Sequence, residues 1–345
     1  MIPNVTSPWS ITAGDFPEKG SLHDKILFLL GYAILAPSGH NSQPWLFRVS
    51  DSYLDVIADR TRALPVVDPQ DRALEISCGA AIGLLEVAAR RFGLKTDLEI
   101  TPNADDPDLL ARIRFASGSQ PSTEEIALFD AIPNRHTNRT AFSMDTLPAT
   151  FTKGCTDIAH ETGIEIRLLA EIEDRVELAI LVAEGDRRQF DDPCFRRELA
   201  AWIHSKRLGS RDGMSGACLG MPDLLAGVGR LVIRTFDMGD GIAAADEAKI
   251  LSGTPALLVF GSADTTRGWV NTGRALGRVT LLATSLGLAT SYLNQPVEVD
   301  ALRPDVKFVA GLDSQPQILL RVGRSQATLA PTARRDVSEV IVQGG

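Results

Sequence analysis

The apolar residues of the first 120 positions recur at helical spacing in two stretches and alternate as in strands between them. Residues 22–35 and 74–92 predict helices, the second with small residues along one face. Strands are predicted at 45–49, 53–58, 94–100 and 111–115. We expect the first helix to end before Pro37, because the residue preceding a proline is driven out of the α region. Gly93 is expected to cap the second helix.

The remaining residues continue the pattern with longer helices. Helices are predicted at 124–132, 151–162, 171–190 and 269–286, and strands at 164–169, 255–260, 288–293 and 317–322. The stretch 191–241 is irregular and rich in Gly and Arg, and we interpret it as helical pieces joined by loops that form a candidate lid. The loop at 117–123 is the predicted boundary between two halves.

The order of elements repeats within the chain. Gly93 and Gly287 each follow a helix and precede a strand, and they lie 194 positions apart (287 − 93 = 194). The same shift aligns five further pairs of identical residues: Ala81 with Ala275, Gly83 with Gly277, Ala89 with Ala283, Leu94 with Leu288, and Thr96 with Thr290. Chance likeness of two Ala- and Gly-rich helices is the alternative. The repeat favours two related α+β units in one chain.

Charge and the N-terminus narrow the class of protein. The formal net charge of −9 gives a surface that repels phosphate backbones and anionic lipids, so neither nucleic acid nor a membrane surface is an expected partner. The N-terminus lacks the basic and apolar segments of a secretory signal. The apolar run at 26–36 is too short to span a bilayer. A cytoplasmic location is therefore expected.

The sequence contains none of the motifs that mark a metal site or a serine hydrolase. The four cysteines are scattered and form no CxxC pair, which fits a reducing compartment and predicts no metal site: Cys78, Cys155, Cys194 and Cys218. HExxH and GxSxG motifs are also missing from the sequence. Metal-dependent and serine hydrolases therefore have no support.

The turn at 37–45, Pro-Ser-Gly-His-Asn-Ser-Gln-Pro-Trp, gathers a hydroxyl, an imidazole and two carboxamides. Such groups donate and accept hydrogen bonds without charge, which suits a polar heterocycle or a sugar-like chain. An ordinary polar loop is the alternative interpretation.

A second polar motif, Arg135-His136-Thr137-Asn138-Arg139, follows a short helix. Guanidinium groups match the oxygens of a phosphate, so two arginines beside a hydroxyl favour a phosphate site. A solvated basic turn is the alternative. Arg334 and Arg335 in the tail offer a third cation for the same phosphate, or else belong to a surface tail.

These segments together resemble the nitroreductase family. The turn at 36–45 is similar to the family's PSxxNxQPW motif, and 135–139 resembles its RRSxR or RHSxK motif. Residues 286–295 resemble the family's late Gly-Leu-x-Ser strand, and the tail from Arg334 resembles its closing segment. Asp336 stands where the family usually has proline, so Arg335 could take the part of Arg334.

The two main motifs stand in an unusual order. In the family the arginine motif precedes the PSxxN turn, whereas here it follows, and each half keeps only one of the two. Family members bind each FMN between two subunits, one supplying each motif. The resemblance therefore implies an α+β nitroreductase fold with two similar halves, 1–120 and 121–345, forming an intramolecular pseudo-dimer with one FMN site. This arrangement is similar to that of the tandem-domain, Acg-like branch of the family.

The resemblance also implies roles for individual residues. Arg135, Thr137 and Arg334 would hold the FMN phosphate, and Arg139 would lie near the N1/O2 edge of the flavin. The other half would contact the ribityl chain and the ring of the flavin through Ser38, Gly39, Asn41 and Gln43. The backbone around Asn294 and Gln295 would face N5 or O4. His40 is a weak candidate for a general acid, and His136 is expected to be structural.

The implied activity is FMN-dependent transfer of two electrons through flavin N5 to a small organic acceptor, with NAD(P)H as donor. If 191–241 covers the flavin, the alternative is an FMN-binding or flavin-storage protein with little turnover. A specialised oxidase or dehydrogenase is a third possibility. The pseudo-dimer would allow a monomer to function alone.

Overall fold

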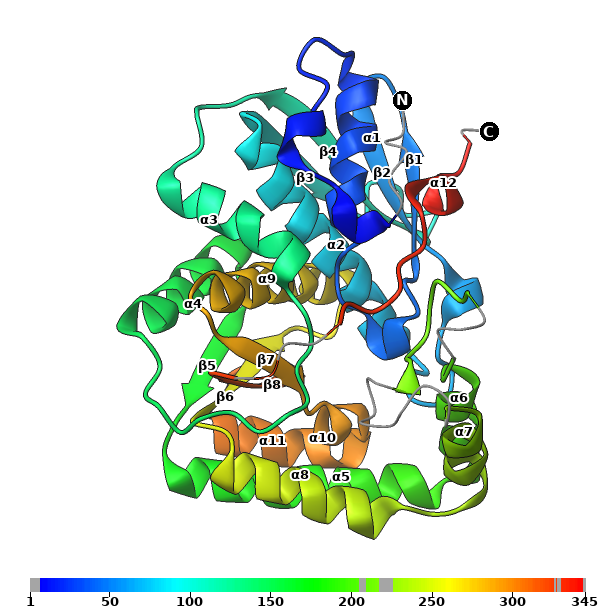
Figure 1. The fold of residues 1–345 in the computed structure, drawn as a ribbon, viewed down its shortest axis with the longest axis vertical. Coiled ribbons are helices and arrows are strands. Elements are labelled where there is room, and N and C mark those ends of the chain that lie inside the picture. Colours follow the sequence, from blue (N-terminus) through cyan, green and yellow to red (C-terminus); the bar gives the residue numbers. More distant parts are fainter. Residues whose placement is uncertain (1–6, 205–208, 217–225, 326, 328–329, 344–345) are drawn as a thin grey trace.

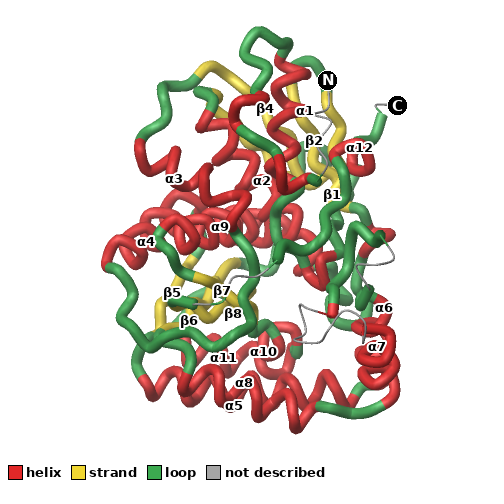
Figure 2. Tube along the Cα trace, in the orientation of Figure 1, coloured by secondary structure: helices red, strands yellow, loops and turns green. Residues whose placement is uncertain are grey.

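The computed structural model describes residues 7–204, 209–216, 226–325, 327 and 330–343. Parts of the predicted lid, with Cys218, lie outside the described residues. The strands form two four-stranded sheets. Figures 1 and 2 show one sheet above the other, with helices between and below them. The mixed helix and sheet composition agrees with the predicted α+β class. Within the described residues, no helix is both long and apolar enough to cross a bilayer.

The upper sheet belongs to the first half of the chain and is antiparallel throughout. Its strand order is β1-β2-β4-β3. The strands are β1 (Trp45–Val49), β2 (Tyr53–Ala58), β3 (Leu94–Ile100) and β4 (Leu109–Ser117). Helices α1 (Leu22–Ala33) and α2 (Arg72–Arg91) share one apolar core with this sheet, in which Trp45 and Phe47 are fully buried. Burial of these rings is a main source of stability for the upper half.

The lower sheet has the same order of strands, β5-β6-β8-β7. The strands are β5 (Glu165–Leu169), β6 (Ala256–Ser262), β7 (Ala289–Tyr292) and β8 (Gln315–Gly323). All seven residues of β6 are buried, because helices cover the sheet on both sides. On one side lie α4 (Ala149–Thr162) and α9 (Thr266–Ser285), and on the other α5 (Ile172–Asp191), α10 (Gln295–Glu298) and α11 (Arg303–Ala310).

The two halves meet where α2 crosses α9, and the contact is made by glycines. A Cβ added to Gly79 would strike the backbone of Val270 and Gly273, and one added to Gly273 would strike the backbone of Ile76 and Gly79. Gly79 and Gly273 are related by the predicted shift of 194 (273 − 79 = 194). Reciprocal contact of this kind is what a two-fold axis produces in a dimer, and it supports the expected pseudo-dimer.

Finer details repeat in both halves. Gly93 and Gly287 have φ of 69° and 70° directly after α2 and α9. This left-handed conformation suits glycine and ends each helix, as predicted for Gly93. The pairing of β2 with β4 shifts register between Val56 and Ile57, and the pairing of β6 with β8 shifts between Phe260 and Gly261.

Two segments of the second half contact the first half. α3 (Thr123–Ala131) packs on both α2 and α9, and the chain then runs beside β7 of its own half, where Thr137 bridges Thr290. The tail leaves β8, forms α12 (Val337–Val340), and pairs Ile341 with Phe47 at the edge of β1. This path brings the C-terminal arginines to the first half.

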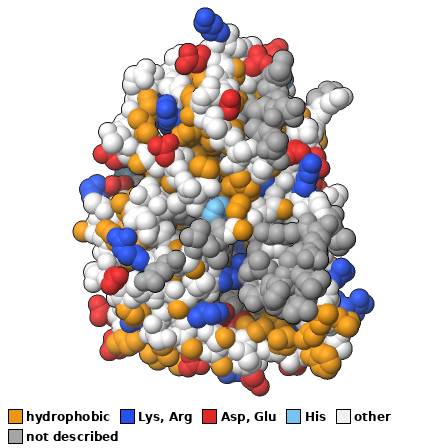
Figure 3. Space-filling model, viewed as in Figure 1, with side chains coloured by type: hydrophobic (Ala, Val, Ile, Leu, Met, Phe, Trp, Pro, Cys, Tyr) orange, Lys and Arg blue, Asp and Glu red, His pale blue; other side chains and the backbone are white. Residues whose placement is uncertain are grey.

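In the irregular stretch, where helical pieces joined by loops were expected, the described residues form α6 (Pro193–Ala201) and α7 (Ala226–Thr235), and α8 (Gly239–Ser252) begins there. The bounds of these helices, and the helices α10 and α11, were not predicted. α8 has apolar residues spread around its circumference, so it lacks the periodic stripe that marks a surface helix. The short α10 and α11 each have a proline in the first turn, which suits the start of a helix. The apolar side chains of α7 reach solvent, Val228 and Leu231 being 58% and 62% exposed (Figure 3).

Candidate functional site

The predicted turn is conformationally strained. His40, Asn41 and Gln43 have φ of 49°, 57° and 54°, a left-handed conformation that costs energy in residues with a side chain. The described part of the chain contains only two other such residues that are not glycine, Asp71 and Thr101. Strain of this kind persists only where surrounding contacts hold it, and it concentrates at ligand-binding positions.

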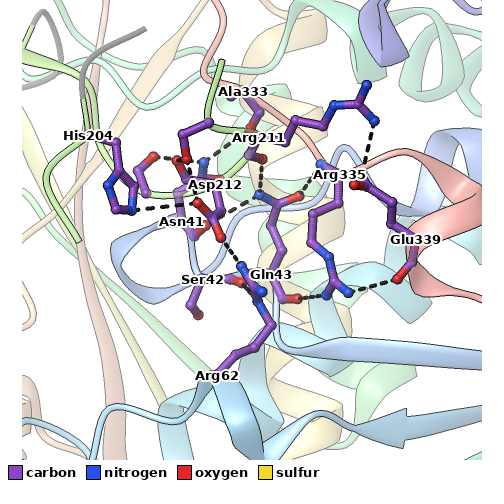
Figure 4. Close-up of polar contacts among 12 residues, drawn as sticks. Asn41, Ser42, Gln43, Arg62, His204, Arg211, Asp212, Ala333, Arg335 and Glu339 are labelled. Atoms are coloured by element: carbon purple, nitrogen blue, oxygen red, sulfur yellow. Dashed lines mark hydrogen bonds and ion pairs between the residues drawn. The ribbon is translucent and has the colours of Figure 1, made fainter. Parts of the chain in front are cut away.

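Both carboxamides of the turn are tied to distant parts of the chain (Figure 4). Asn41 Nδ2 donates to the carbonyls of Gly213 (2.9 Å) and Ala333 (3.1 Å). Gln43 Nε2 donates to the Arg211 carbonyl at 2.8 Å, and its Oε1 accepts from the Arg335 amide at 2.8 Å. The turn therefore joins the loop at 209–214 to the C-terminal tail.

The loop at 209–214 is held by further contacts. The Gly213 amide donates to the Asn41 carbonyl at 3.2 Å, and Arg62 forms an ion pair with Asp212. Arg211 pairs with Asp336 and Glu339 of the tail. Because this loop belongs to the candidate lid at 191–241, that segment touches the turn directly. Sequence reasoning did not find these partners, since nothing in the motif marks which distant carbonyl it will bind.

The arginine motif is anchored beside the late strand, β7. The Asn138 amide donates to the Thr290 carbonyl at 2.9 Å, and the Asn138 side chain donates to Ser325 Oγ at 2.9 Å. Arg321, 1% exposed, donates to the carbonyls of Asn138 and Thr140. This part of the motif is therefore fixed, while Thr137 is half-buried and Arg139 is exposed.

The arginine motif, the turn and the tail converge on the end of α1. Arg135 Nη2 donates to the Leu35 carbonyl at 3.4 Å, and Arg334 Nη2 donates to the same oxygen at 3.3 Å. Arg334 also donates to the Ala36 carbonyl and to Asn41 Oδ1 at 2.8 Å. The three segments predicted to share one site therefore do lie together. Ser38 closes the turn by accepting from the Gln43 amide at 2.9 Å.

These residues form an arginine cluster, which we define by electrostatic proximity as Arg135, Arg139, Arg334, His40, His136 and Tyr292. Burial and the nearby guanidinium of Arg139 lower the pKa of His40 to about 4. Burial, Arg135 and Arg334 lower the pKa of His136 to about 4. Burial raises the pKa of Tyr292 to about 12, against the opposing effect of the three arginines. All three groups are uncharged at neutral pH, so the positive charge comes from the arginines alone.

Several polar atoms of this cluster have no hydrogen-bond partner among the described residues. They are His40 Nε2, Tyr292 Oη, and both Nε and Nη1 of Arg135. Arg135 is 3% exposed, and it forms no ion pair with any carboxylate of the described residues. A buried guanidinium with two unused donors costs free energy unless an anion completes it. The cluster therefore has the chemistry of an anion site.

The side chains of Asn294 and Gln295 lie apart from this cluster. Asn294 Oδ1 accepts from the Leu319 amide at 3.0 Å and so extends the pairing of the lower sheet. Gln295 Nε2 donates to Asp186 at 2.9 Å and to Asp246 at 3.3 Å. Burial and Asp246 raise the pKa of Asp186 to about 7. Any contact of Asn294 and Gln295 with a flavin would be through the backbone, as the prediction had it.

A surface cavity of about 300 Å³ is bounded by residues of α5 and the start of α8, Arg187, Arg188, Asp191, Asp237, Gly239 and Asp240. Both of its arginines form ion pairs, Arg187 with Asp240 at 3.0 Å and Arg188 with Glu184 at 2.7 Å. It shares no residue with the arginine cluster, so we do not regard it as the predicted site.

Curated relatives align over nearly the whole chain. Two proteins of Mycobacterium tuberculosis, each named "Putative NAD(P)H nitroreductase", are similar to it. One is 31% identical over 94% of this chain and 92% of its own length, and the other, which also carries the name acg, is 28% identical over 94% and 97%. Another M. tuberculosis protein, named as uncharacterized, is 27% identical over 90% of both chains. No protein-family model matches the sequence.

Solved structures match less closely. A nitroreductase structure from Anabaena variabilis, described as putative, covers 79% of this chain with a TM-score of 0.45 and 13% identity, over 69% of its own length. An FMN- and NADPH-dependent nitroreductase, NfnB of a Sphingopyxis strain, covers 63% of this chain and 99% of its own with a TM-score of 0.41 and 18% identity.

Proposed function

The chain belongs to the nitroreductase family, and on that premise we propose that it is an FMN-dependent oxidoreductase with one composite flavin site. The site takes the turn from the first half and the arginine motif and tail from the second. NAD(P)H is the proposed electron donor, and a nitroaromatic, quinone or enone-like compound is the proposed acceptor. The relatives' names support the donor class.

The observation that carries this proposal is the incomplete bonding of Arg135. Its guanidinium is buried, yet Nε and Nη1 have no partner among the described residues. A phosphate offers oxygens that accept from such a guanidinium in pairs. Arg334, which shares the Leu35 carbonyl with Arg135, supplies a second cation next to it. FMN ends in a phosphate, so the residues present fit this cofactor.

The remaining residues of the cluster orient the flavin and balance its charge. When bound, FMN supplies hydride chemistry at N5. Arg139 would place positive charge against the pyrimidine edge of the ring, where the reduced flavin is anionic, and Thr137 would donate its hydroxyl to the phosphate. Ser38, Gly39 and the Asn41 backbone would line the ribityl chain. The backbone of Asn294 and Gln295 would face N5 or O4.

His40 is better suited to hydrogen bonding than to acid catalysis. A pKa of about 4 leaves it neutral at pH 7, so it holds no proton to release as an imidazolium. Its unpartnered Nε2 is instead available to the flavin or the substrate. Protons for the reaction would come from water.

A second candidate function, flavin binding with little turnover, is favoured by the loop at 209–214. This loop is bonded to the turn through Asn41 and Gln43 and to Arg62 through Asp212. A loop held against a cofactor site restricts the entry of a second molecule. If it remains closed, NADPH would not reach the flavin.

An absorption spectrum of the purified protein, before and after anaerobic addition of NADPH, tests both functions. We expect the absorption bands of the flavin itself, at about 370 and about 450 nm. These bands should bleach when NADPH is added. Bands that persist would favour the low-turnover function. A protein that contains no flavin, and binds none when FMN is added, would overturn the composite site. Arg135→Met serves as the site-specific control and should show weakened FMN binding.

A further inference from the structure

Trp9 lies against the arginine cluster from outside the two family motifs. The centre of its ring is 4.9 Å from Cζ of Arg334, and its ring meets that of His136 edge-on with centroids 4.9 Å apart. The indole Nε1 donates to the Thr332 carbonyl at 2.8 Å. Trp9 therefore contacts both the tail that carries Arg334 and the motif that carries Arg135.

The position of Trp9 is fixed by its neighbours in sequence. It lies in a short 3-10 helix, Pro8–Ser10, whose preceding Ser7 accepts from the Trp9 amide at 3.4 Å. Ile11 is buried against α1, where a Cβ added to Gly31 would strike Ile11 Cδ1. Glycine at this point of α1 lets the N-terminal segment pack closely, and the indole is held in place by packing as well as by one hydrogen bond.

The indole covers a face of a guanidinium whose edges are already occupied. Arg334 donates to the carbonyls of Leu35 and Ala36 and to Asn41 and Thr332. Cation–π contact with Trp9 then closes one of its two flat faces. The rings of Trp9 and His136 therefore lie beside Arg334 and Arg135, the two arginines of the proposed phosphate site.

We propose that Trp9 and His136 form a wall at the phosphate end of the flavin site, and that this wall selects FMN over FAD. The inference rests on the proposed function. FAD continues beyond the same phosphate into a second phosphate and an adenosine, so it needs an opening where the two rings stand. FMN ends in a monoester that carries nearly two negative charges and three acceptor oxygens, and it needs no such opening.

The proposal is tested by the ratio of the dissociation constants for FAD and FMN, measured by flavin fluorescence titration of the full-length apoprotein. Wild type is expected to bind FMN at least about 100-fold more tightly than FAD, a preference of nearly 3 kcal/mol. Trp9→Ala should lower that ratio by about tenfold or more, mainly by strengthening FAD binding. Trp9→Phe keeps a ring over Arg334 and should retain most of the preference.

Trp202→Ala is the matched control. Trp202 also lies over an arginine, with its ring 5.6 Å from Cζ of Arg62, but on the loop side of the turn. Its loss should leave the FAD-to-FMN ratio unchanged. His136→Ala removes the second ring of the wall and should shift the ratio in the same direction as Trp9→Ala, which keeps the test decisive if Trp9→Ala does not fold.

The titrations distinguish a failure of the wall from a failure of the FMN site. A wild-type protein that binds FMN and FAD equally, or a ratio unmoved by both Trp9→Ala and His136→Ala, overturns the wall while leaving the FMN site intact. A wild-type protein that binds neither flavin overturns the proposed function itself, and the wall with it.

Discussion

Arg135 and Arg334 approach from separate parts of the second half of the chain and donate to one carbonyl oxygen, that of Leu35, at 3.4 and 3.3 Å. Leu35 follows α1 of the first half and directly precedes the strained turn. One backbone oxygen thus holds two cations in place between the halves. Like charges repel, so two guanidinium groups at this distance from a single acceptor leave a strong local demand for an anion.

Replacing Arg135 should affect stability and flavin binding in opposite directions. Arg135→Met removes a buried charge with two unused donors, so the apoprotein is expected to gain about 1–3 kcal/mol in free energy of unfolding. FMN affinity should fall about 10- to 100-fold, because hydrogen bonds to a charged group are worth about 1.5–3 kcal/mol. Urea unfolding of the apoprotein and FMN titration measure the two effects.

Arg175→Met is the matched control for this substitution. Arg175 is also buried, but it donates to the carbonyls of Thr254 (2.8 Å) and Ile250 (3.4 Å), away from the cluster. Its loss should destabilise the protein and leave FMN affinity unchanged. An Arg135→Met apoprotein that is less stable than wild type would contradict the interpretation of Arg135 as an incomplete anion site.

The histidines predict a loss of stability in acid. Since burial and Arg139 lower the pKa of His40 from 6.5 to about 4, the unfolded chain takes up a proton near pH 6.5 that the folded chain refuses until about pH 4. The contribution of neutral His40 to the free energy of unfolding is present above pH 6.5 and is lost as the pH falls from 6.5 to about 4. At about pH 4.5 the loss amounts to about 2–3 kcal/mol, at about 1.36 kcal/mol for each pKa unit.

His40→Asn isolates this contribution, because asparagine tolerates the left-handed φ of 49° and does not titrate there. Unfolding free energies at pH 7 and pH 4.5 should differ less in the variant than in wild type. His160→Gln, on α4 outside the arginine cluster, should follow the wild-type curve. If His40→Asn follows it too, His40 does not carry the acid sensitivity.

The loop at 209–214 predicts a rate effect. Arg62→Ala removes the ion pair with Asp212 and the hydrogen bond to the Ser42 carbonyl, and so loosens the loop from the turn. If the loop limits access, the rate of flavin reduction by NADPH should rise several-fold. Stopped-flow absorbance measures that rate. Arg114→Ala, an exposed arginine paired with Glu99 on the upper sheet, is the control. An unchanged rate in Arg62→Ala would remove the support for a restricting loop.

The close crossing of α2 and α9 predicts that even a methyl side chain at the contact lowers the stability of the protein. Gly79→Ala would push a Cβ into the backbone of Val270 and Gly273, which cannot move away as a flexible side chain could. Overpacking of a rigid contact costs about 1–3 kcal/mol or more. Gly241→Ala in α8, where nothing lies within 4 Å of the added Cβ, should instead stabilise by about 0.5–1 kcal/mol. Thermal unfolding of both variants compares them, and equal melting temperatures would refute the close crossing.

Sequence patterns predicted well where local chemistry decides the structure. The helix ends at Gly93 and Gly287 follow from glycine's freedom at positive φ; the cap at Gly93 was expected from the sequence, and the repeat aligned Gly287 with it. The convergence of Arg135, Arg334 and the turn was expected as well, but from the family resemblance and not from periodicity. That part of the candidate site is present in the structure, while the roles of its residues toward FMN stay predictions.

The partners of individual side chains in distant segments could not be predicted from the sequence. Asn41 and Gln43 were assigned to the flavin, yet their side-chain groups bind the backbone of the loop and the tail. A carboxamide in a motif shows that a hydrogen bond is needed, not where its partner lies. Trp9 was missed because a single aromatic residue near the N-terminus has no periodic context, and its contact with Arg334 depends on the path of the tail.

The glycine crossing of α2 and α9 separates two tasks that a dimer interface usually combines. Gly79 and Gly273 let the backbones of α2 and α9 touch, the Arg274–Glu86 ion pair joins the same two helices, and no residue of the arginine cluster takes part in this joint. Each half thus contributes one helix to the joint, while the residues that recognise a ligand are divided unequally between the halves. A chain built this way can give up one of two ligand sites, or redesign the other, without weakening the joint on which its architecture depends.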